Sequence, residues 1–124
     1  MSQIDVGEID GVATTNMVVL EGVLKSDPSL REVGDGTVLR EFVVGTRIDG
    51  RMVNAPVVCA ESLGASLGEG DRVVVVGSVR TRFFAAGGRT QSRTEVVANH
   101  VAGARSKAAR TKALTAVSAH IKSM

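Results

Sequence analysis

The chain has 124 residues, of which 44% are hydrophobic and 23% are charged, and this balance is that of one ordinary globular domain. No apolar run approaches the roughly 20 residues that a membrane-spanning helix needs, and the first residues lack the basic and apolar segments of a secretory signal. The single cysteine, Cys59, excludes an intrachain disulfide and is typical of a protein of the reducing cytoplasm.

The net charge of +2 is distributed unevenly along the chain. Residues 1–10 contain three acids and no base, and residues 103–124 contain five bases and no acid. Between them, residues 11–102 contain ten acids and ten bases. Within that balanced part, residues 72–94 contain five arginines and no acid. Such a local basic patch indicates a nucleic-acid partner better than a high global charge does.

The first elements in chain order are an arm and a strand. Residues 1–15 lack clear periodicity, and we interpret them as a loose N-terminal arm or as an extra edge strand around Val12-Ala13. Residues 17–24 are β-branched and partly alternating, with Glu21 opposite Leu20, which predicts a half-buried strand. Asp27-Pro28-Ser29 then turns the chain, because proline fixes φ and lacks an N–H donor.

Two further strands are predicted on either side of a tight turn. Residues 37–48 form the first of them, after the turn Gly34-Asp35-Gly36, and Asp49-Gly50 is a strong hairpin signal. Residues 51–60 return as the next strand, in which Pro56 requires an edge or bulge position. Residues 61–67 are expected to form a short helical connector.

The valine run of residues 72–77 is apolar on both faces, which predicts a central strand. Gly87-Gly88 makes the next hairpin, and residues 90–101 form the last strand. Residues 103–122 are rich in helix formers and place Leu114, Val117 and Ile121 on one stripe. We expect this stripe to pack on a neighbouring subunit; the alternative is that the cations of the tail form a nucleic-acid arm.

These elements predict an all-β fold of five strands with a short helix between the third and fourth strands. This is the order of the OB-fold, a Greek-key barrel that binds oligonucleotides and oligosaccharides on strands 2–3 and nearby loops. Another small barrel or a sandwich is the alternative architecture. The predicted divisions are an arm at 1–15, an OB-fold domain at 16–102 and a basic, helix-prone tail at 103–124.

The candidate binding residues centre on the fourth predicted strand. Arg80, Arg82 and Phe84 share one strand face, whereas Phe83 points to the other and is expected in the core. Two cations beside an exposed ring suit a phosphate backbone with an unpaired base stacked next to it, and solvated charges are the alternative interpretation. Further candidates for phosphate contacts are Arg31, Arg40, Arg47, Arg51, Arg72 and Arg93.

No catalytic or metal-binding pattern is visible in the sequence. His100 and His120 have no partners at ligand spacing, and the acids are scattered over predicted turns. Cys59 follows an apolar pair and is expected to be a small buried hydrophobe, as Phe42 is expected to be a core residue. The sequence therefore predicts no enzyme, no metal and no cofactor.

Several segments, taken in order, resemble the bacterial single-stranded DNA-binding proteins (SSB). The likeness runs from about Asn16 to about Val101. Its motifs are the opening strand at 16–24, Asp27-Pro28-Ser29-Leu30-Arg31, Phe42-Val43-Val44-Gly45-Thr46, Gly77-x-Val79-Arg80-Thr81-Arg82-x-Phe84 and Thr94-Glu95-Val96-Val97. The resemblance implies an OB-fold protomer, usually a homotetramer, that wraps single-stranded DNA without strong sequence preference. It also implies a role in DNA replication, recombination or repair.

The chain departs from that family in two ways. It has no Trp or Tyr, and Gly50, Asn54 and Ala60 stand in the region where members usually have aromatic residues. Its tail is short and basic and ends in Ile121-Lys122-Ser123-Met124, without the acidic tip that docks partner enzymes. A divergent paralogue is the natural interpretation. The rival hypothesis is an assembly subunit, primosome-like or mixed with the main SSB, that binds DNA weakly.

Overall fold

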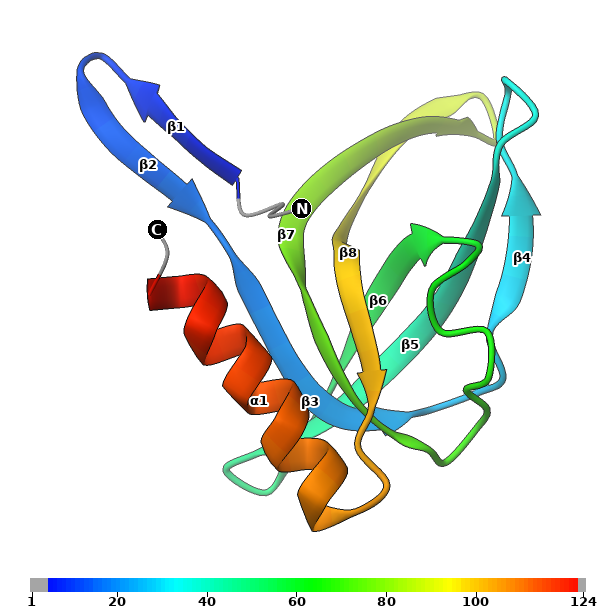
Figure 1. Ribbon diagram of the computed structural model, residues 1–124. Coiled ribbons are helices and arrows are strands. Elements are labelled where there is room, and N and C mark those ends of the chain that lie inside the picture. Colours follow the sequence, from blue (N-terminus) through cyan, green and yellow to red (C-terminus); the bar gives the residue numbers. More distant parts are fainter. Residues whose placement is uncertain (1–4, 123–124) are drawn as a thin grey trace.

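The computed structural model describes residues 5–122 of the protein, so the predicted arm begins and the predicted tail ends outside the described residues. The elements in this range are β1 (Asp5–Ile9), β2 (Val12–Asn16), β3 (Val18–Leu24), β4 (Ser29–Glu32), β5 (Val38–Ile48), β6 (Arg51–Ala60), β7 (Arg72–Ala86), β8 (Arg89–Gly103) and α1 (Lys107–Lys122). Figure 1 shows a barrel of long strands with α1 lying along one side and the β1–β2 hairpin extending away from it. No helix in residues 5–122 is long and apolar enough to cross a membrane.

The barrel is a sheet of the order β3-β7-β8-β6-β5, closed by pairing of β3 with β5. The closure is short and involves Val23 opposite Gly45 and Leu24 opposite Val44. Strands β6 and β8 are parallel at Val57 and Val58, and the other pairs are antiparallel. This is the five-stranded Greek-key barrel of the OB-fold, as the sequence predicted. The short strand β4 adds to the edge of β5.

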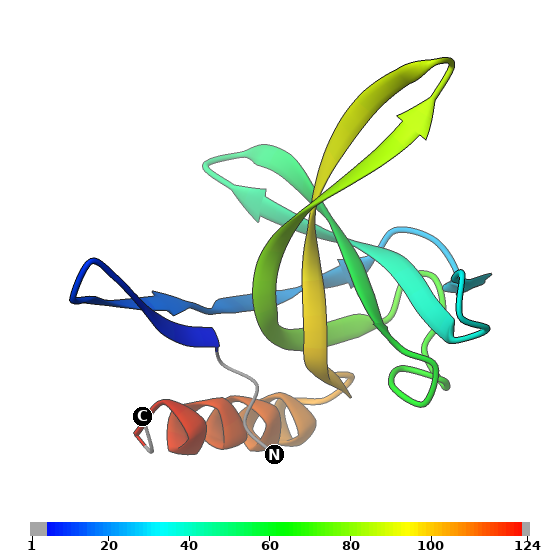
Figure 2. The same ribbon diagram turned by 90° about the horizontal axis from the view of Figure 1, so that it is seen from above.

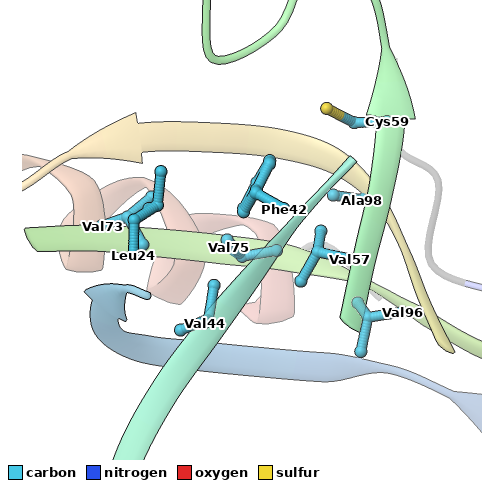
Figure 3. Packing of buried hydrophobic residues seen from close by; sticks show 9 residues of the cluster. All are labelled: Leu24, Phe42, Val44, Val57, Cys59, Val73, Val75, Val96 and Ala98. Atoms are coloured by element: carbon cyan, nitrogen blue, oxygen red, sulfur yellow. The ribbon is translucent and has the colours of Figure 1, made fainter. Parts of the chain in front are cut away.

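The barrel interior is filled by side chains from all five strands, among them Leu24, Phe42, Val57, Val75 and Val96 (Figure 3). Phe42 is 4% exposed and Cys59 is 2% exposed, so both predictions of burial are confirmed. Pro56 of β6 lies opposite Val43 of β5, whereas the pairing of β6 with β8 begins at the next residue, Val57. At Pro56 the strand therefore has a neighbour on the β5 side and an open edge on the other. The edge position predicted for this proline is therefore confirmed.

Both faces of the valine run in β7 are buried, but by different partners. Val73 and Val75 face the barrel interior, whereas Val74 and Val76 pack against Ala113 of α1 and its neighbours Ala104 and Val117. The Arg110 guanidinium, on the same helical face as Ala113 and Val117, donates to Glu21 Oε1 of β3 at 3.0 Å and holds the helix to this neighbouring strand. Leu114 and Val117 of α1 thus pack on the barrel of the same chain, which corrects the predicted packing of this stripe on a neighbouring subunit.

Three local features differ from the sequence-based predictions. Residues 5–16 form a hairpin, in which Asp10 and Gly11 have φ values of 50° and 79°, instead of a loose arm. The alternative prediction of a strand around Val12-Ala13 agrees with β2, although β2 pairs with β1 and not with an edge of the barrel sheet. Residues 61–66 make consecutive turns instead of the predicted helical connector. The segment after Pro28 continues as β4, where only a turn was expected. Each of these segments is too short for periodicity to decide its structure.

Candidate nucleic-acid interface

A β-bulge determines which side chains meet on the β7–β8 hairpin. Val76 lies opposite His100 and Gly77 lies opposite Ala98, so Asn99 is the extra residue of β8. Before the bulge in β8 the even-numbered Val96 and Ala98 pack on the core, and after it the odd-numbered Val101 does so. Because one extra residue reverses the faces of a strand, Glu95 is turned to the outside of the barrel.

On that outer face Glu95 joins the two predicted arginines. Arg80 lies directly opposite Glu95, and its Nη2 is 3.3 Å from Glu95 Oε2. Arg82 Nε donates to Glu95 Oε1 at 3.0 Å, and its guanidinium lies 5.0 Å from the centroid of the Phe84 ring. Arg93 lies opposite Arg82 on the same face. We call Arg80, Arg82, Phe84, Arg93 and Glu95 the arginine face.

The charge state of this face depends on Glu95, which is only 4% exposed. Burial by itself raises the pKa of the carboxyl, but hydrogen bonds and charge attraction from Arg82 and Arg80 outweigh it, so the pKa lies below its ordinary value. Glu95 is therefore ionised at neutral pH and cancels part of the arginine charge. The Arg80 side chain remains 49% exposed and that of Arg82 28%, so both can reach a phosphate.

The arginine face adjoins an open cleft on the outer surface of the barrel. The cleft has a volume of about 220 Å³ and is lined by Arg93 and Glu95 of β8, by Glu41 and Pro56 of β5 and β6, and by Asp27 of the β3–β4 loop. In the OB-fold the corresponding strands 2–3 and their flanking loops form the ligand face. The Asp27 carboxylate accepts from the Glu69 N–H at 2.8 Å, which fastens the loop at one end of the cleft.

The other predicted arginines lie outside the cleft lining, and only Arg31 contacts a residue of the cleft. Arg31 of β4 has its Nε 3.1 Å from Glu41 Oε1, an ion pair whose N–H is not aligned for a hydrogen bond. Arg47 and Arg51 lie at the end of the β5–β6 hairpin, where Arg47 Nη1 donates to the Gly50 carbonyl at 3.2 Å. Arg72 begins β7, at the opposite end of the strand from Arg82, and is not part of the arginine face.

Arg40, a further phosphate candidate, makes contacts within the fold. Its Nη2 and Nε donate to the Glu61 carbonyl at 2.8 and 3.2 Å, which anchors the turns after β6. Burial raises the pKa of the nearby Cys59 thiol against the opposing charge of Arg40, so Cys59 is not a reactive thiolate. Within residues 5–122 no three His, Cys, Asp or Glu side chains gather as a metal site would require.

Phe83 is exposed, which contradicts its predicted core position. Its side chain is 70% exposed, whereas Phe84 is half-buried beneath Arg82. Phe83 lies on the same inward face of β7 as Val75. It is eight residues further along the strand, however, a distance of about 26 Å in an extended chain. The β7–β8 hairpin runs beyond the barrel there, so the inward face has no core left to cover (Figure 2).

Sequence reasoning missed the role of Glu95 and Glu41 as partners of the arginines. The available signal was position: Glu95 is the first acid after the acid-free span 72–94 and directly precedes the buried Val96. Its pairing with Arg80 and Arg82 follows only from the register that the Asn99 bulge creates.

Comparison with known proteins supports the fold. No protein-family model matches the chain, and no curated protein is significantly similar to it. Among solved structures, the complex of Plasmodium falciparum SSB with single-stranded DNA superposes with a TM-score of 0.60 at 18% sequence identity, over 73% of this chain and 95% of that chain. At this identity the likeness establishes the OB-fold of the present chain.

Proposed function

We propose that the protein binds single-stranded DNA, with little sequence preference, along the arginine face and the adjoining cleft. The observation that carries the proposal is the combination of three cations and an aromatic ring on one face of the β7–β8 hairpin, beside the cleft of an OB barrel. Exposed guanidinium groups attract any phosphate, and a ring stacks on any base, so this combination has no preferred sequence. One solved structure to which the barrel is similar is itself a complex with single-stranded DNA.

The proposed role is that of a binding protein without catalysis. Two carboxylates that line the cleft belong to strands, Glu41 of β5 and Glu95 of β8. Both form ion pairs with arginines, so neither is available as a general base. We place the protein in DNA replication, recombination or repair in the cytoplasm, as a homo-oligomer and in the manner of a divergent SSB paralogue. The resemblance of the strand motifs to that family supports this finer assignment.

A titration of fluorescein-labelled oligo-dT, followed by fluorescence anisotropy at low salt, tests the proposal. If Arg80, Arg82, Arg93 and Arg31 displace counterions from three to four phosphates, the slope of log K against log salt is about −2 to −3. Mixed-sequence oligonucleotides are expected to bind within a few-fold of oligo-dT. An absence of binding at micromolar protein, or a strong preference for duplex DNA, would contradict the proposal.

A second candidate function is that of an OB-fold assembly subunit with weak DNA binding. The observation that favours it is the apolar surface at the ends of the two long hairpins, where Ile48 is 59%, Val53 is 51% and Phe83 is 70% exposed. The partial cancellation of the arginine charge by Glu95 and Glu41 also favours it. Co-purification from cell extract with and without nuclease separates the two functions, because a protein partner of an assembly subunit survives nuclease treatment.

A further inference from the structure

The β1–β2 hairpin is not part of the barrel sheet. It forms a separate two-stranded sheet, and Figures 1 and 2 both show it extending away from the barrel on the side to which the C-terminal end of α1 also projects. Ile9 and Val12, which lie opposite each other next to the turn, are each 65% exposed. An isolated two-stranded hairpin is at best marginally stable in water, so this one needs a surface to pack on.

The charge of the hairpin is of one sign. Residues 1–24 contain four acids and no base, and Glu8 and Asp10 flank Ile9 at the exposed end of the hairpin. Glu21, the fourth of these acids, is already bound by Arg110. Within residues 5–122, Glu8 and Asp10 form no ion pair. The exposed end of the hairpin is therefore apolar and anionic at once.

Helix α1 presents a surface of the complementary kind. The side away from the barrel has the small, exposed residues Ala108, Thr111, Thr115 and Ser118. Lys107, Lys112 and Lys122 are also exposed, and the sequence from 103 to 122 contains no acid. No cation of the helix other than Arg110 has an ion-pair partner among the residues that the structure describes. This side of α1 is flat and cationic, and it is left unused in a single chain.

We propose that the β1–β2 hairpin is a dimerisation arm that packs on the outer side of α1 of a second copy of this chain, while the second copy's hairpin packs on the first. Ile9 and Val12 cover the small side chains of the partner's helix, and Asp10, in the turn beside them, pairs with its lysines. Glu8, whose side chain leaves the opposite face of β1, adds to the negative charge near them. Because both halves of the contact are present in each chain, two copies satisfy each other by a two-fold rotation and the assembly closes. The arm and α1 are separate from the arginine face, so this inference goes beyond the proposed function.

Charge reversal provides a direct test on the full-length protein without DNA. The arm variant E8K/D10K and the helix variant K107E/K112E each place like charges across the contact, so in sedimentation velocity each alone is expected to self-associate at least tenfold more weakly than the wild type. An equimolar mixture of the two is expected to recover a one-to-one heterodimer in native mass spectrometry, because the cationic arm then meets an anionic helix and the anionic arm a cationic one. The matched control E61K/E69K changes the same charge on exposed residues away from both surfaces and is expected to associate like the wild type.

Three results would overturn the proposal: a monomeric wild type at high micromolar concentration, undiminished self-association of both variants, or the absence of a heterodimer in the mixture. Circular dichroism of each variant shows whether it is folded, and I9S/V12S provides a second, uncharged disruption of the same contact. An oligo-dT titration of the variants separates this inference from the proposed function. DNA binding by a monomeric arm variant leaves the function intact, and a dimer that binds no DNA leaves the arm intact.

Discussion

At the scale of single residues, the arginine face is a set of cations held in place by one buried acid. Glu95 is nearly inaccessible to solvent and accepts hydrogen bonds from both Arg80 and Arg82, which holds two flexible side chains on one strand face. The arrangement reduces the net charge but orders the donors before a ligand arrives. Preorganised donors lose less conformational entropy on binding. This smaller entropy loss offsets part of the electrostatic attraction to phosphate that the Glu95 charge cancels.

Arg82 is expected to contribute most among the arginines, because it contacts both Glu95 and the Phe84 ring. We predict that Arg82→Ala weakens oligo-dT binding about five- to tenfold and reduces the salt slope by about 0.7, the value for one phosphate of a single strand. Arg72→Ala is the matched control, since it removes the same charge from the other end of β7. Equal losses in both variants would show that the binding depends on total charge and not on the arginine face.

The two adjacent phenylalanines lie on opposite faces of β7 and so form a natural pair of test and control. Phe84→Ala is predicted to weaken oligo-dT binding, because base–aromatic stacking is worth about 1–3 kcal/mol per base. Phe83→Ala is expected to change the affinity less than twofold, although Phe83 is the more exposed ring. The anisotropy titration measures both. The reverse result would place the DNA on the opposite face of the hairpin.

The lowered pKa of Glu95 gives a pH dependence with a definite sign. A carboxyl whose folded pKa is lowered stabilises the protein above its unfolded value of about 4.3, and this contribution is lost as the pH falls through the lower folded value. Glu95→Gln is therefore predicted to cost about 1–3 kcal/mol of unfolding free energy at neutral pH and to flatten the acid limb of the stability profile. Urea denaturation from pH 7 to 3 measures both effects.

The same substitution is expected to raise DNA affinity a few-fold at low salt, because it removes the charge that opposes the phosphates. If the unfolding free energy of Glu95→Gln falls as steeply at acid pH as that of the wild type, the contacts with Arg80 and Arg82 do not stabilise the ionised form of Glu95. A loss of DNA affinity in a folded Glu95→Gln protein would show that Glu95 matters more for positioning the arginines than for cancelling their charge.

At the scale of elements, the bulge between β7 and β8 connects the fold to the site. Gly77 stands at the register shift, where a Cβ atom would collide with the backbone carbonyl of Val97. This close approach lets β8 accommodate Asn99 and turn Glu95 outward. A side chain at position 77 must therefore displace the backbone that sets the faces of β8.

Gly77→Ala is predicted to reduce the unfolding free energy by about 1–3 kcal/mol or more and to weaken DNA binding as well, because the arginine face depends on the register. Gly34→Ala is the control, since a Cβ there meets no atom within 4 Å. Thermal unfolding and the oligo-dT titration measure the two effects. A Gly77→Ala protein as stable as Gly34→Ala would contradict the role given to this close approach.

The elements that the sequence predicted well are those with long patterns. The Asp49-Gly50 turn was recognised because two alternating strands flank it, and both residues have positive φ, at 50° and 76°. Asp10-Gly11 has the same dipeptide and nearly the same φ values, but its strands of five residues are too short and polar to stand out. The signal for the N-terminal hairpin was therefore present in the turn and missing in the strands.

At the scale of the whole molecule, the predictable part and the unpredictable part of the site have different origins. That Arg80, Arg82 and Phe84 share a face follows from strand periodicity, and the structure brings them together. The pairing with Glu95, the exposure of Phe83 and the separation of Arg72 depend on register, on how far a hairpin outruns the barrel and on which end of a strand a residue occupies. Those are tertiary properties that a single sequence does not encode locally.

The two proposed binding surfaces lie on different elements of the molecule. The arginine face and the cleft lie along β5, β6 and the β7–β8 hairpin, whereas α1 covers the valine run of β7 and the β1–β2 hairpin extends away from the barrel (Figure 1). Under the two proposals, one surface would bind DNA while another binds a second copy of the chain. The assembly would then present more than one DNA-binding face, which is how avidity for a long strand arises.

The most direct test of the central claim is the map of backbone amide shifts in ¹⁵N-labelled protein on addition of oligo-dT. The structure predicts that the largest changes fall on residues 80–84 and 91–95 and on the cleft residues of β5 and β6, with little change in α1 or at Arg72. Shifts confined to the basic tail that forms α1, or no shifts at saturating oligonucleotide, would contradict the proposed DNA-binding face.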